Sequence, residues 1–337
     1  MIANGSTRDP NGDQVLAVRN LTVSYKTESG YAKAVDDVSF TVDKGEILGL
    51  AGESACGKST TALSIMRLLA SNAVVKGQIL FENKDVLRMS EDELRNFRWK
   101  GVSLIPQGSM NSLDPVIQVG KQIVEAIRAH ESVSRTEAWK VTEKLLSSVS
   151  IHPTRAKDYP HEFSGGMKQR AVTAMALALN PKLVIADEPT TALDVVVQKQ
   201  LLLVLRELQK SSRISFIFVS HDLSVIGEIA DRVAVMYAGK IVEIGRKETV
   251  LKNPSHPYTQ ALVNSVPKVF GNRQLLESIP GSPPTGIWPT GCRFHPRCKF
   301  AFDLCRQKEP ELQHAATGSL AACHLISKTD KEEMILK

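Results

Sequence analysis

The sequence of 337 residues contains no apolar run long enough to cross a membrane. A membrane-spanning helix needs about 18 or more consecutive apolar residues, and the most apolar helical stretch, Ala171 to Leu179, is roughly half that long. The first residues, MIANGSTRDPNGDQ, have neither a basic start nor an apolar segment, so they do not match a secretion signal. We therefore expect the chain to stay in the cytoplasm unless a partner holds it at a membrane.

A block of like charges, an internal repeat and a coiled coil are also missing from the sequence. The formal net charge is +6, but Lys and Arg are scattered among acidic residues. Because nucleic-acid-binding proteins usually cluster their basic residues, we expect a solvated surface and no nucleic-acid partner. With 42% hydrophobic and 23% charged residues, the chain can bury a large core, as one big domain with an appendage or as two domains.

Short apolar runs and alternating apolar residues indicate an α/β fold. They predict strands at residues 15–25, 35–42, 46–52, 183–186 and 214–220. Between the last two strands, a helix from Gln198 to Lys210 fits a crossover connection, so we expect a largely parallel sheet with helices packed on it. A hairpin from Tyr237 to Ile241 would close this domain.

Composition divides the chain into a core, an insertion and a Cys-rich end. Helical patterns between polar loops predict a helical subdomain inserted at about residues 85–165. Pro, Gly and Cys become frequent toward the C-terminus. We expect a core domain over residues 14–260, a small C-terminal extension over 261–330, and loose tails at 1–13 and 331–337.

A glycine-rich loop follows the third predicted strand. The segment GESACGKS, from Gly52 to Ser59, matches the P-loop pattern of two glycines separated by four residues and followed by Lys and Ser or Thr. In this pattern backbone N–H groups and the next helix's dipole face the phosphates, Lys adds positive charge and the hydroxyl ligates Mg²⁺. The predicted ATP-binding residues here are Gly52, Glu53, Ser54, Ala55, Cys56, Gly57, Lys58, Ser59 and Thr60. An ordinary glycine-rich turn is the alternative, and Cys56 is interpreted as a small filling residue.

Two adjacent acids end the fourth predicted strand, in LVIADEP. An acid at the end of a buried apolar strand is costly unless something compensates its charge, and a nearby Mg²⁺ would do so. Asp187 is the candidate partner of Mg²⁺, directly or through water, and Glu188 is the candidate general base that polarises the attacking water. Taken alone, the pair could instead be a helix N-cap and a neighbouring surface acid.

Four further short motifs accompany the P-loop and the acidic pair. They are PQ at Pro106–Gln107, FSGGMKQR at Phe163–Arg170, ALD at Ala192–Asp194 and SHD at Ser220–Asp222. In this order the six motifs resemble those of the ATP-binding cassette (ABC) family. The resemblance implies a P-loop NTPase fold, with an ABC nucleotide-binding domain and an inserted helical subdomain.

The resemblance also implies roles for single residues. Lys58, Glu188 and His221 would be catalytic, with His221 at the γ-phosphate. Gln107 would contact Mg²⁺, and Tyr25 would stack on adenine, although Tyr31 could serve if the intervening loop folds back. In this family the signature helix binds ATP held by a second subunit. The residues assigned to that partner ATP are Ser164, Gly165, Gly166 and Asp194.

The resemblance narrows to the D-type ATPase of oligopeptide and dipeptide importers, because FSGGMKQR, ADEPTTALDVVVQ, HPYTQAL and the late cysteines occur together. It implies an ATPase that drives peptide uptake at the cytoplasmic face of the cell membrane. Its partners would be a sister F-type ATPase or a second copy, two permease subunits and an extracellular or periplasmic solute-binding protein. Relatives that import nickel or oligosaccharides leave the cargo open. Ala55 and Cys56 replace the commoner Gly-Ser, and both are small enough for binding.

Four cysteines gather near the C-terminus, at Cys292, Cys298, Cys305 and Cys323. No CxxC pair occurs, so the spacing alone indicates only a four-thiolate metal site, with free cysteines in a loop-rich tail as the alternative. The family resemblance implies a [4Fe-4S] cluster. Because so small a unit has little core, we expect the cluster to be structural. We also expect loss of Cys298 to loosen the extension while nucleotide affinity stays nearly intact.

Two functions from other classes are less consistent with the sequence. A soluble ABC protein acting on nucleic acid or ribosomes usually carries two cassettes or a long coiled coil, and this chain has neither. A redox protein that uses the cluster would be a third class, but no flavin or nicotinamide fingerprint is present.

Overall fold

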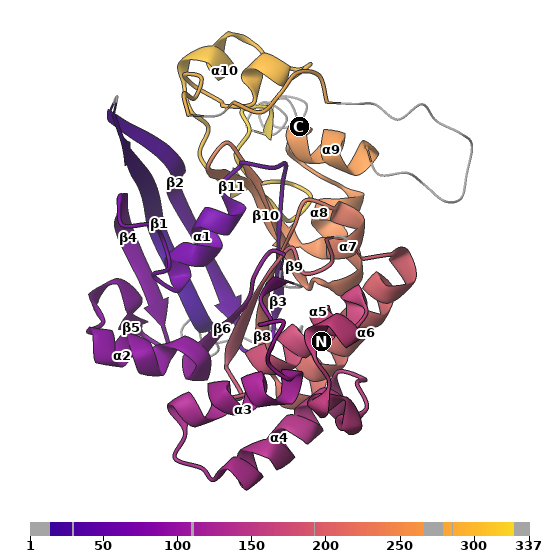
Figure 1. Cartoon of the computed structure of the whole chain (residues 1–337). Coiled ribbons are helices and arrows are strands. Elements are labelled where there is room, and N and C mark those ends of the chain that lie inside the picture. Colours follow the sequence, from indigo (N-terminus) through magenta and orange to yellow (C-terminus); the bar gives the residue numbers. More distant parts are fainter. Residues whose placement is uncertain are drawn as a thin grey trace, which may run out of the picture.

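The protein is described here by a computed structural model that covers residues 14–28, 30–108, 111–191, 193–265, 279–284 and 286–326. The tails predicted at 1–13 and 331–337 lie outside these ranges. Within them, two β-sheets and their covering helices form the core, as Figure 1 shows. No helix in the described part of the chain is both long and apolar enough to span a bilayer.

The larger sheet has eight strands in the order β11-β12-β10-β9-β3-β8-β7-β6. Its parallel part consists of β6 (Val102–Ile105), β7 (Leu183–Asp187), β8 (Ser215–Ser220), β3 (Ile47–Ala51) and β9 (Arg232–Tyr237). Every residue of β3, β7 and β8 is buried, which is typical of parallel strands covered on both faces. The expected parallel sheet is therefore confirmed. The expected hairpin is formed by β9 and β10 (Lys240–Arg246).

The structure contains a second, smaller sheet, which the sequence did not predict as a separate sheet. Its antiparallel strands run in the order β2-β1-β4-β5, and they are β1 (Gln14–Thr27), β2 (Gly30–Asp43), β4 (Ala73–Phe81) and β5 (Lys84–Asp85). Local alternation predicts that β1 and β2 are strands, but their sheet is decided by pairing with β4, which is distant in the sequence. The expectation of one largely parallel core sheet is thus incomplete.

Successive side chains of the central strands are buried in two different hydrophobic cores, one on each face of the larger sheet. In β7, Val184 and Ala186 belong to the core on the helical side, whereas Leu183 and Ile185 belong to the core between the two sheets. This follows from the alternation of side chains along a strand. Helix α1 (Lys58–Ile65) contacts β2 of the smaller sheet and β7 and β8 of the larger one. The helix that starts at the P-loop is therefore held from both sides.

The inserted helices lie at the opposite end of the molecule from the extension that carries α10 (Asp303–Gln307) (Figure 1). The inserted elements are 3₁₀ turn Val86–Arg88, α2 (Glu91–Asn96), π-helical turn Phe97–Gly101, α3 (Val119–His130), α4 (Arg135–Ser148), and 3₁₀ turns Pro153–Lys157 and Pro160–Glu162. Capping boxes start α2 at Ser90 and α4 at Ser134. The domain limits stay a prediction. However, β6 falls within the proposed range 85–165 and pairs with β7, so that strand belongs to the core sheet.

The remaining helices connect or cover the larger sheet. They are α5 (Gly165–Ala176), α6 (Val195–Ser212), α7 (Leu223–Ile229), α8 (Lys247–Lys252), α9 (Pro257–Asn264) and a 3₁₀ turn at His295–Arg297. The predicted crossover helix is α6, which is longer than expected because Asp194 caps its start. The C-terminal strands β11 (Gln313–His314) and β12 (Leu320–Ala321) extend the larger sheet beside β10. The C-terminal extension therefore shares its sheet with the core.

A buried carboxylate connects this extension to the core. Glu243 of β10 is fully buried, and its Oε1 accepts hydrogen bonds from the Ser255 N–H at 2.8 Å and the Ser319 hydroxyl at 2.9 Å. Its Oε2 accepts from the N–H of His256 at 3.0 Å. Glu243 thus binds both the start of α9 and the turn before β12.

We predict that Glu243→Leu lowers the free energy of unfolding by roughly 3 kcal/mol or more, because a similar-sized apolar side chain removes the acceptor of three hydrogen bonds and leaves the N–H groups of Ser255 and His256 without it. Urea denaturation with proteolysis of the C-terminal region would measure this. Glu248→Leu, on the exposed face of α8, is the control and should change the stability by about 0.5 kcal/mol or less. Equal stability of the two variants would contradict this role of Glu243.

Candidate nucleotide-binding site

The P-loop connects β3 to α1 in a conformation that requires glycine at two positions. Gly52 has φ 147° and Gly57 has φ 105°, which side chains rarely tolerate. A Cβ at Gly52 would lie 2.3 Å from the carbonyl oxygen of Met236, and one at Gly57 would lie 2.6 Å from that of Ala34. The loop is therefore pressed against β9 and β2, and the alternative of an arbitrary glycine-rich turn does not account for this close approach.

The side chain of Lys58 lies inside the P-loop. Its Nζ donates hydrogen bonds to the carbonyl oxygens of Gly52 at 2.8 Å and Glu53 at 2.9 Å, and the residue is only 5% exposed. Cys56 is buried beside it, with Sγ 3.7 Å from Nζ. Burial raises the pKa of the Cys56 thiol, although Lys58 opposes this effect. A neutral buried thiol agrees with the interpretation of Cys56 as a filling residue.

The predicted magnesium ligands lie together. The Ser59 hydroxyl donates to Oδ1 of Asp187 at 3.1 Å, across from α1 to the end of β7. Burial raises the pKa of Asp187, while the hydrogen bond from Ser59 lowers it and the neighbouring Glu188 raises it. A hydroxyl and a buried carboxylate with little compensating charge are the oxygen ligands that suit Mg²⁺.

The carboxylate of Glu188 contacts three other side chains, and two of them follow strands that neighbour β7 in the larger sheet. Its Oε2 accepts hydrogen bonds from Gln107 Nε2 at 3.2 Å and Thr191 Oγ1 at 3.1 Å, and its Oε1 lies 3.1 Å from Nδ1 of His221. Gln107 follows β6, Glu188 follows β7, and His221 follows β8. Because parallel strands end at the same edge of a sheet, residues far apart in sequence meet there. Thr191 was not predicted to take part.

The residues assigned to a partner's ATP lie at two helix starts. Ser164 caps α5 by accepting from the N–H of Met167, and Asp194 caps α6. Ser164 and Gly165 are exposed, whereas a Cβ at Gly166 would lie 2.3 Å from Val197 of α6. Within the described residues no hydrogen bond joins Ser164 or Asp194 to the P-loop. Their exposed position leaves them available to another molecule.

The two candidate adenine-stacking residues lie on one hairpin. Tyr25 of β1 is directly opposite Ala32 of β2, and Tyr31 is directly opposite Lys26. Since successive residues of a strand alternate between faces, the two tyrosines point to opposite faces of the hairpin. Tyr25 packs partly against the core between the sheets, and Tyr31 is 67% exposed. The assignment of adenine stacking to Tyr25, with Tyr31 as the alternative, stays a prediction.

Two residues of the C-terminal region contact the P-loop, and the sequence analysis missed both. The N–H of Glu53 donates to the hydroxyl of Tyr258 at 2.9 Å, and its carboxylate accepts from both terminal nitrogens of Arg297, at 2.7 and 3.0 Å. The HPYTQAL segment contains Tyr258, but in the sequence it indicates only a family resemblance and no contact with the P-loop. No spacing rule would have linked these residues to Glu53.

The four late cysteines line one small cavity together with His256 and Phe294. None of them is in a disulfide. Burial raises the pKa of Cys292 to about 12 and that of Cys323 to about 11, and the neighbouring cysteines contribute to both shifts. In the described part of the chain, no three His, Cys, Asp or Glu side chains are arranged to hold a single metal ion. The predicted metal-binding character of the extension is thus not established by this arrangement.

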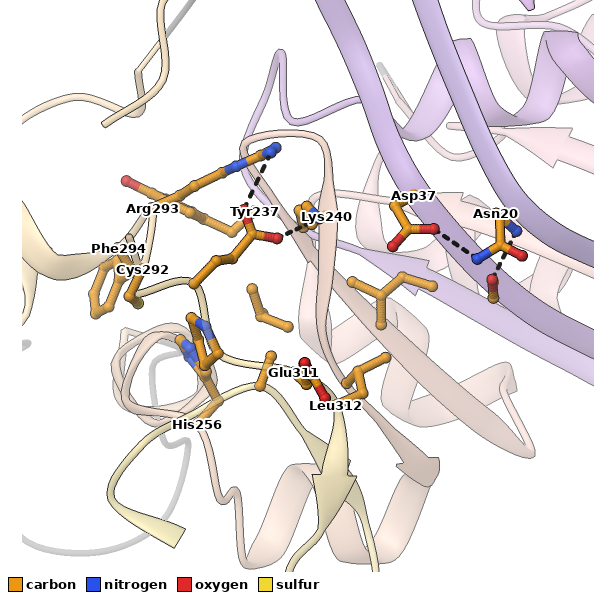
Figure 2. Close-up of a pocket in the computed structure, with 16 residues that line it drawn as sticks. Asn20, Asp37, Tyr237, Lys240, His256, Cys292, Arg293, Phe294, Glu311 and Leu312 are labelled. Carbon is orange, nitrogen blue, oxygen red and sulfur yellow. Dashed lines mark hydrogen bonds and ion pairs between the residues drawn. The ribbon is translucent and has the colours of Figure 1, made fainter. Parts of the chain in front are cut away.

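A separate cavity of about 440 Å³ lies where the extension meets the smaller sheet (Figure 2). Asn20 and Asp37, which are hydrogen-bonded at 2.7 Å, line its side toward the smaller sheet. Arg293 and Lys240 both form ion pairs with Glu309. Its lining includes no P-loop residue, so this cavity is distinct from the nucleotide site.

Comparison with known proteins agrees with this geometry. The model of the ABC transporter family matches residues 35–191, and that of the oligopeptide/dipeptide transporter C-terminal region matches residues 242–305. The chain is 43% identical over 317 residues to the oligopeptide transport ATP-binding protein OppD of Haemophilus influenzae, covering 93% of this chain and 98% of OppD. The chain belongs to the ABC transporter family of ATP-binding proteins.

Other members of the family give the same result. The dipeptide transport ATP-binding protein DppD of Bacillus subtilis is 46% identical over 303 residues, covering 88% of this chain and 90% of DppD. Among solved structures, an ATP-binding cassette dimer in a post-hydrolysis state with ADP and Pi has 25% identity and a TM-score of 0.62, covering 69% of this chain and 98% of that one. The ABC fold expected from the sequence is confirmed, and the protein is an ABC-type ATPase that uses ATP with Mg²⁺.

Proposed function

We propose that this protein is the ATP-hydrolysing subunit of an importer of dipeptides or oligopeptides. The observation that carries the ATPase part is the position of Glu188, between Gln107 and His221 and next in sequence to Asp187. The peptide part rests on the C-terminal region and on relatives named as oligopeptide and dipeptide transport proteins. Importers of nickel or oligosaccharides are the alternative for cargo.

Triphosphate binding is assigned to the P-loop. The ammonium group of Lys58 and the backbone N–H groups at the start of α1 provide positive charge for the phosphates. Ser59 and Asp187 would hold Mg²⁺, which neutralises charge on the phosphate oxygens. The predicted contacts of Ser54, Ala55 and Thr60 belong to the same loop and helix start.

Glu188 is the proposed general base. A carboxylate has about four acceptor positions, and Gln107, Thr191 and His221 account for three of them. These contacts orient the side chain and leave one acceptor position for the attacking water. In this proposal His221 would also contact the γ-phosphate and Gln107 would also contact Mg²⁺, and their observed contacts with Glu188 are consistent with these roles.

A second nucleotide-binding subunit completes the site in this proposal. Ser164, Gly165, Gly166 and Asp194 would bind ATP held by that subunit, and the similar cassette solved as a dimer with ADP and Pi supports this. The second subunit is a sister F-type ATPase or another copy of this chain. Two permeases and an extracellular or periplasmic solute-binding protein would complete the importer, at the cytoplasmic face of the cell membrane.

We predict that Glu188→Gln keeps ATP binding but lowers ATP hydrolysis by about 10²–10⁴-fold, because the amide cannot accept the water's proton. Lys58→Ala is the companion variant and should weaken ATP binding itself. Equilibrium binding of ATP and phosphate release in the reconstituted transporter would separate the two effects. Normal hydrolysis by Glu188→Gln would overturn its assignment. Uptake of labelled peptides, nickel or oligosaccharides would identify the cargo.

We further propose that Cys292, Cys298, Cys305 and Cys323 hold a [4Fe-4S] cluster. Their place around one cavity supports this, as does the four-thiolate donor set. The four thiolates would hold a cluster with several iron atoms rather than one ion, so their sulfurs would not need to converge on a single point. The cluster would connect segments that share little apolar core and so stabilise the extension.

We predict that the protein purified without oxygen contains about four iron atoms per chain. Cys298→Ser should lose most of the iron and make the extension sensitive to protease. Cys56→Ser is the matched control for iron content, since Cys56 lies in the P-loop. Iron and sulfide assays with the visible absorption spectrum measure the outcome, and iron-free wild-type protein with a protease-resistant extension would refute the cluster.

A further inference from the structure

The C-terminal region contacts the P-loop at Glu53. Glu53 is the first variable residue of the loop, and its carbonyl faces inward, where it accepts from Lys58. Its N–H donates to Tyr258, and both oxygens of its carboxylate accept from Arg297. The N–H and carboxylate of Glu53 are therefore occupied by protein groups, which indicates that Glu53 anchors the loop rather than binding nucleotide.

Arg297 is fixed in place as well as paired. Its side chain is 6% exposed. Its two terminal nitrogens form a bidentate ion pair with the Glu53 carboxylate, an arrangement that the guanidinium group favours. The Nε donates to the carbonyl of Pro280 at 2.7 Å, and Nη2 also donates to that of Gly281 at 3.2 Å. A partly buried, bidentate ion pair with further hydrogen bonds differs from the exposed pairs that contribute little to stability.

Aromatic packing places the Tyr258 hydroxyl. Tyr258 is fully buried, with its ring 4.6 Å from that of Tyr237 and 5.3 Å from that of Phe294. Phe294 lies between Cys292 and Cys298, and Arg297 directly precedes Cys298. The N–H of Arg297 donates to the carbonyl of Phe294 at 3.0 Å, which closes the turn. Both groups that hold Glu53 therefore depend on the folding of the cysteine-bearing segment.

We propose that Arg297 and Tyr258 are positioning residues for the nucleotide site. By fixing Glu53 they hold the P-loop in its binding conformation, so ATP affinity depends on the folded C-terminal region. The inference rests on the proposed function, because it assumes that ATP binds at Lys58. It differs from the expectation that loss of Cys298 leaves nucleotide affinity nearly intact, and measurement of ATP affinity distinguishes the two. By linkage, ATP binding should also protect the extension from unfolding.

The proposal is tested with Arg297→Ala and Glu53→Ala, separately and together, by equilibrium ATP binding to the full chain. Each single variant should raise the Kd for ATP by about 5–30-fold, since a flexible loop must be ordered on binding. The double variant should be no weaker than either single variant, because all three lose the same contact. Arg297→Lys should also bind ATP more weakly than the wild type, because lysine cannot form the bidentate ion pair with Glu53.

Glu309→Ala is the control variant, since Glu309 lies in the extension and pairs with Lys240 and Arg293 away from the P-loop. It should leave the Kd unchanged. If Arg297→Ala fails to fold, Glu53→Ala still tests the proposal, because the extension then remains intact. Unchanged affinity in Glu53→Ala, or independent effects that multiply in the double variant, would overturn it. If Lys58→Ala binds ATP as well as the wild type does, the proposed function itself fails.

Discussion

The nucleotide site depends on four neighbouring parallel strands that end at one edge of the larger sheet. Strands β3, β8, β7 and β6 are adjacent in that order, and each is followed by a segment that supplies part of the site. Asp187 is buried at this edge with only the Ser59 hydroxyl and nearby charges to compensate it. A buried carboxylate is costly unless it is paired, hydrogen-bonded or bound to a metal ion. The proposed magnesium site would account for a carboxylate at this position.

The C-terminal region is connected to this core by polar contacts as well as by the packing of Tyr258 and Phe294. Glu243, in β10, accepts hydrogen bonds from Ser255 before α9 and from Ser319 before β12. Arg297 forms an ion pair with Glu53 of the P-loop. A small unit of this kind gains stability from such contacts, and the proposed cluster would add to it. The same contacts bring the region next to the nucleotide. A change in the extension is thus transmitted to the loop that holds the phosphates.

Much of the site was predictable because each motif is local. The glycines of the P-loop, the acids after β7 and the histidine after β8 are identified by short patterns whose backbone needs are known. The sequence did not separate the smaller sheet, since alternation identifies β1 and β2 as strands but not their partners. It also missed Tyr258 and Arg297, which lie 205 and 244 residues from Glu53. No rule of residue spacing in the sequence predicts contacts between residues so far apart.

The sequence by itself determined the nucleotide chemistry of this protein, because backbone conformation and short-range capping place the P-loop, the acidic pair and the signature at the ends of their elements. Only the tertiary structure decided which distant side chains meet. It joined Gln107, Glu188 and His221 in one cluster, and it placed Arg297 against the P-loop. The reason is physical: strand order and sheet pairing arise from burial summed over the whole chain, and no local segment contains that information.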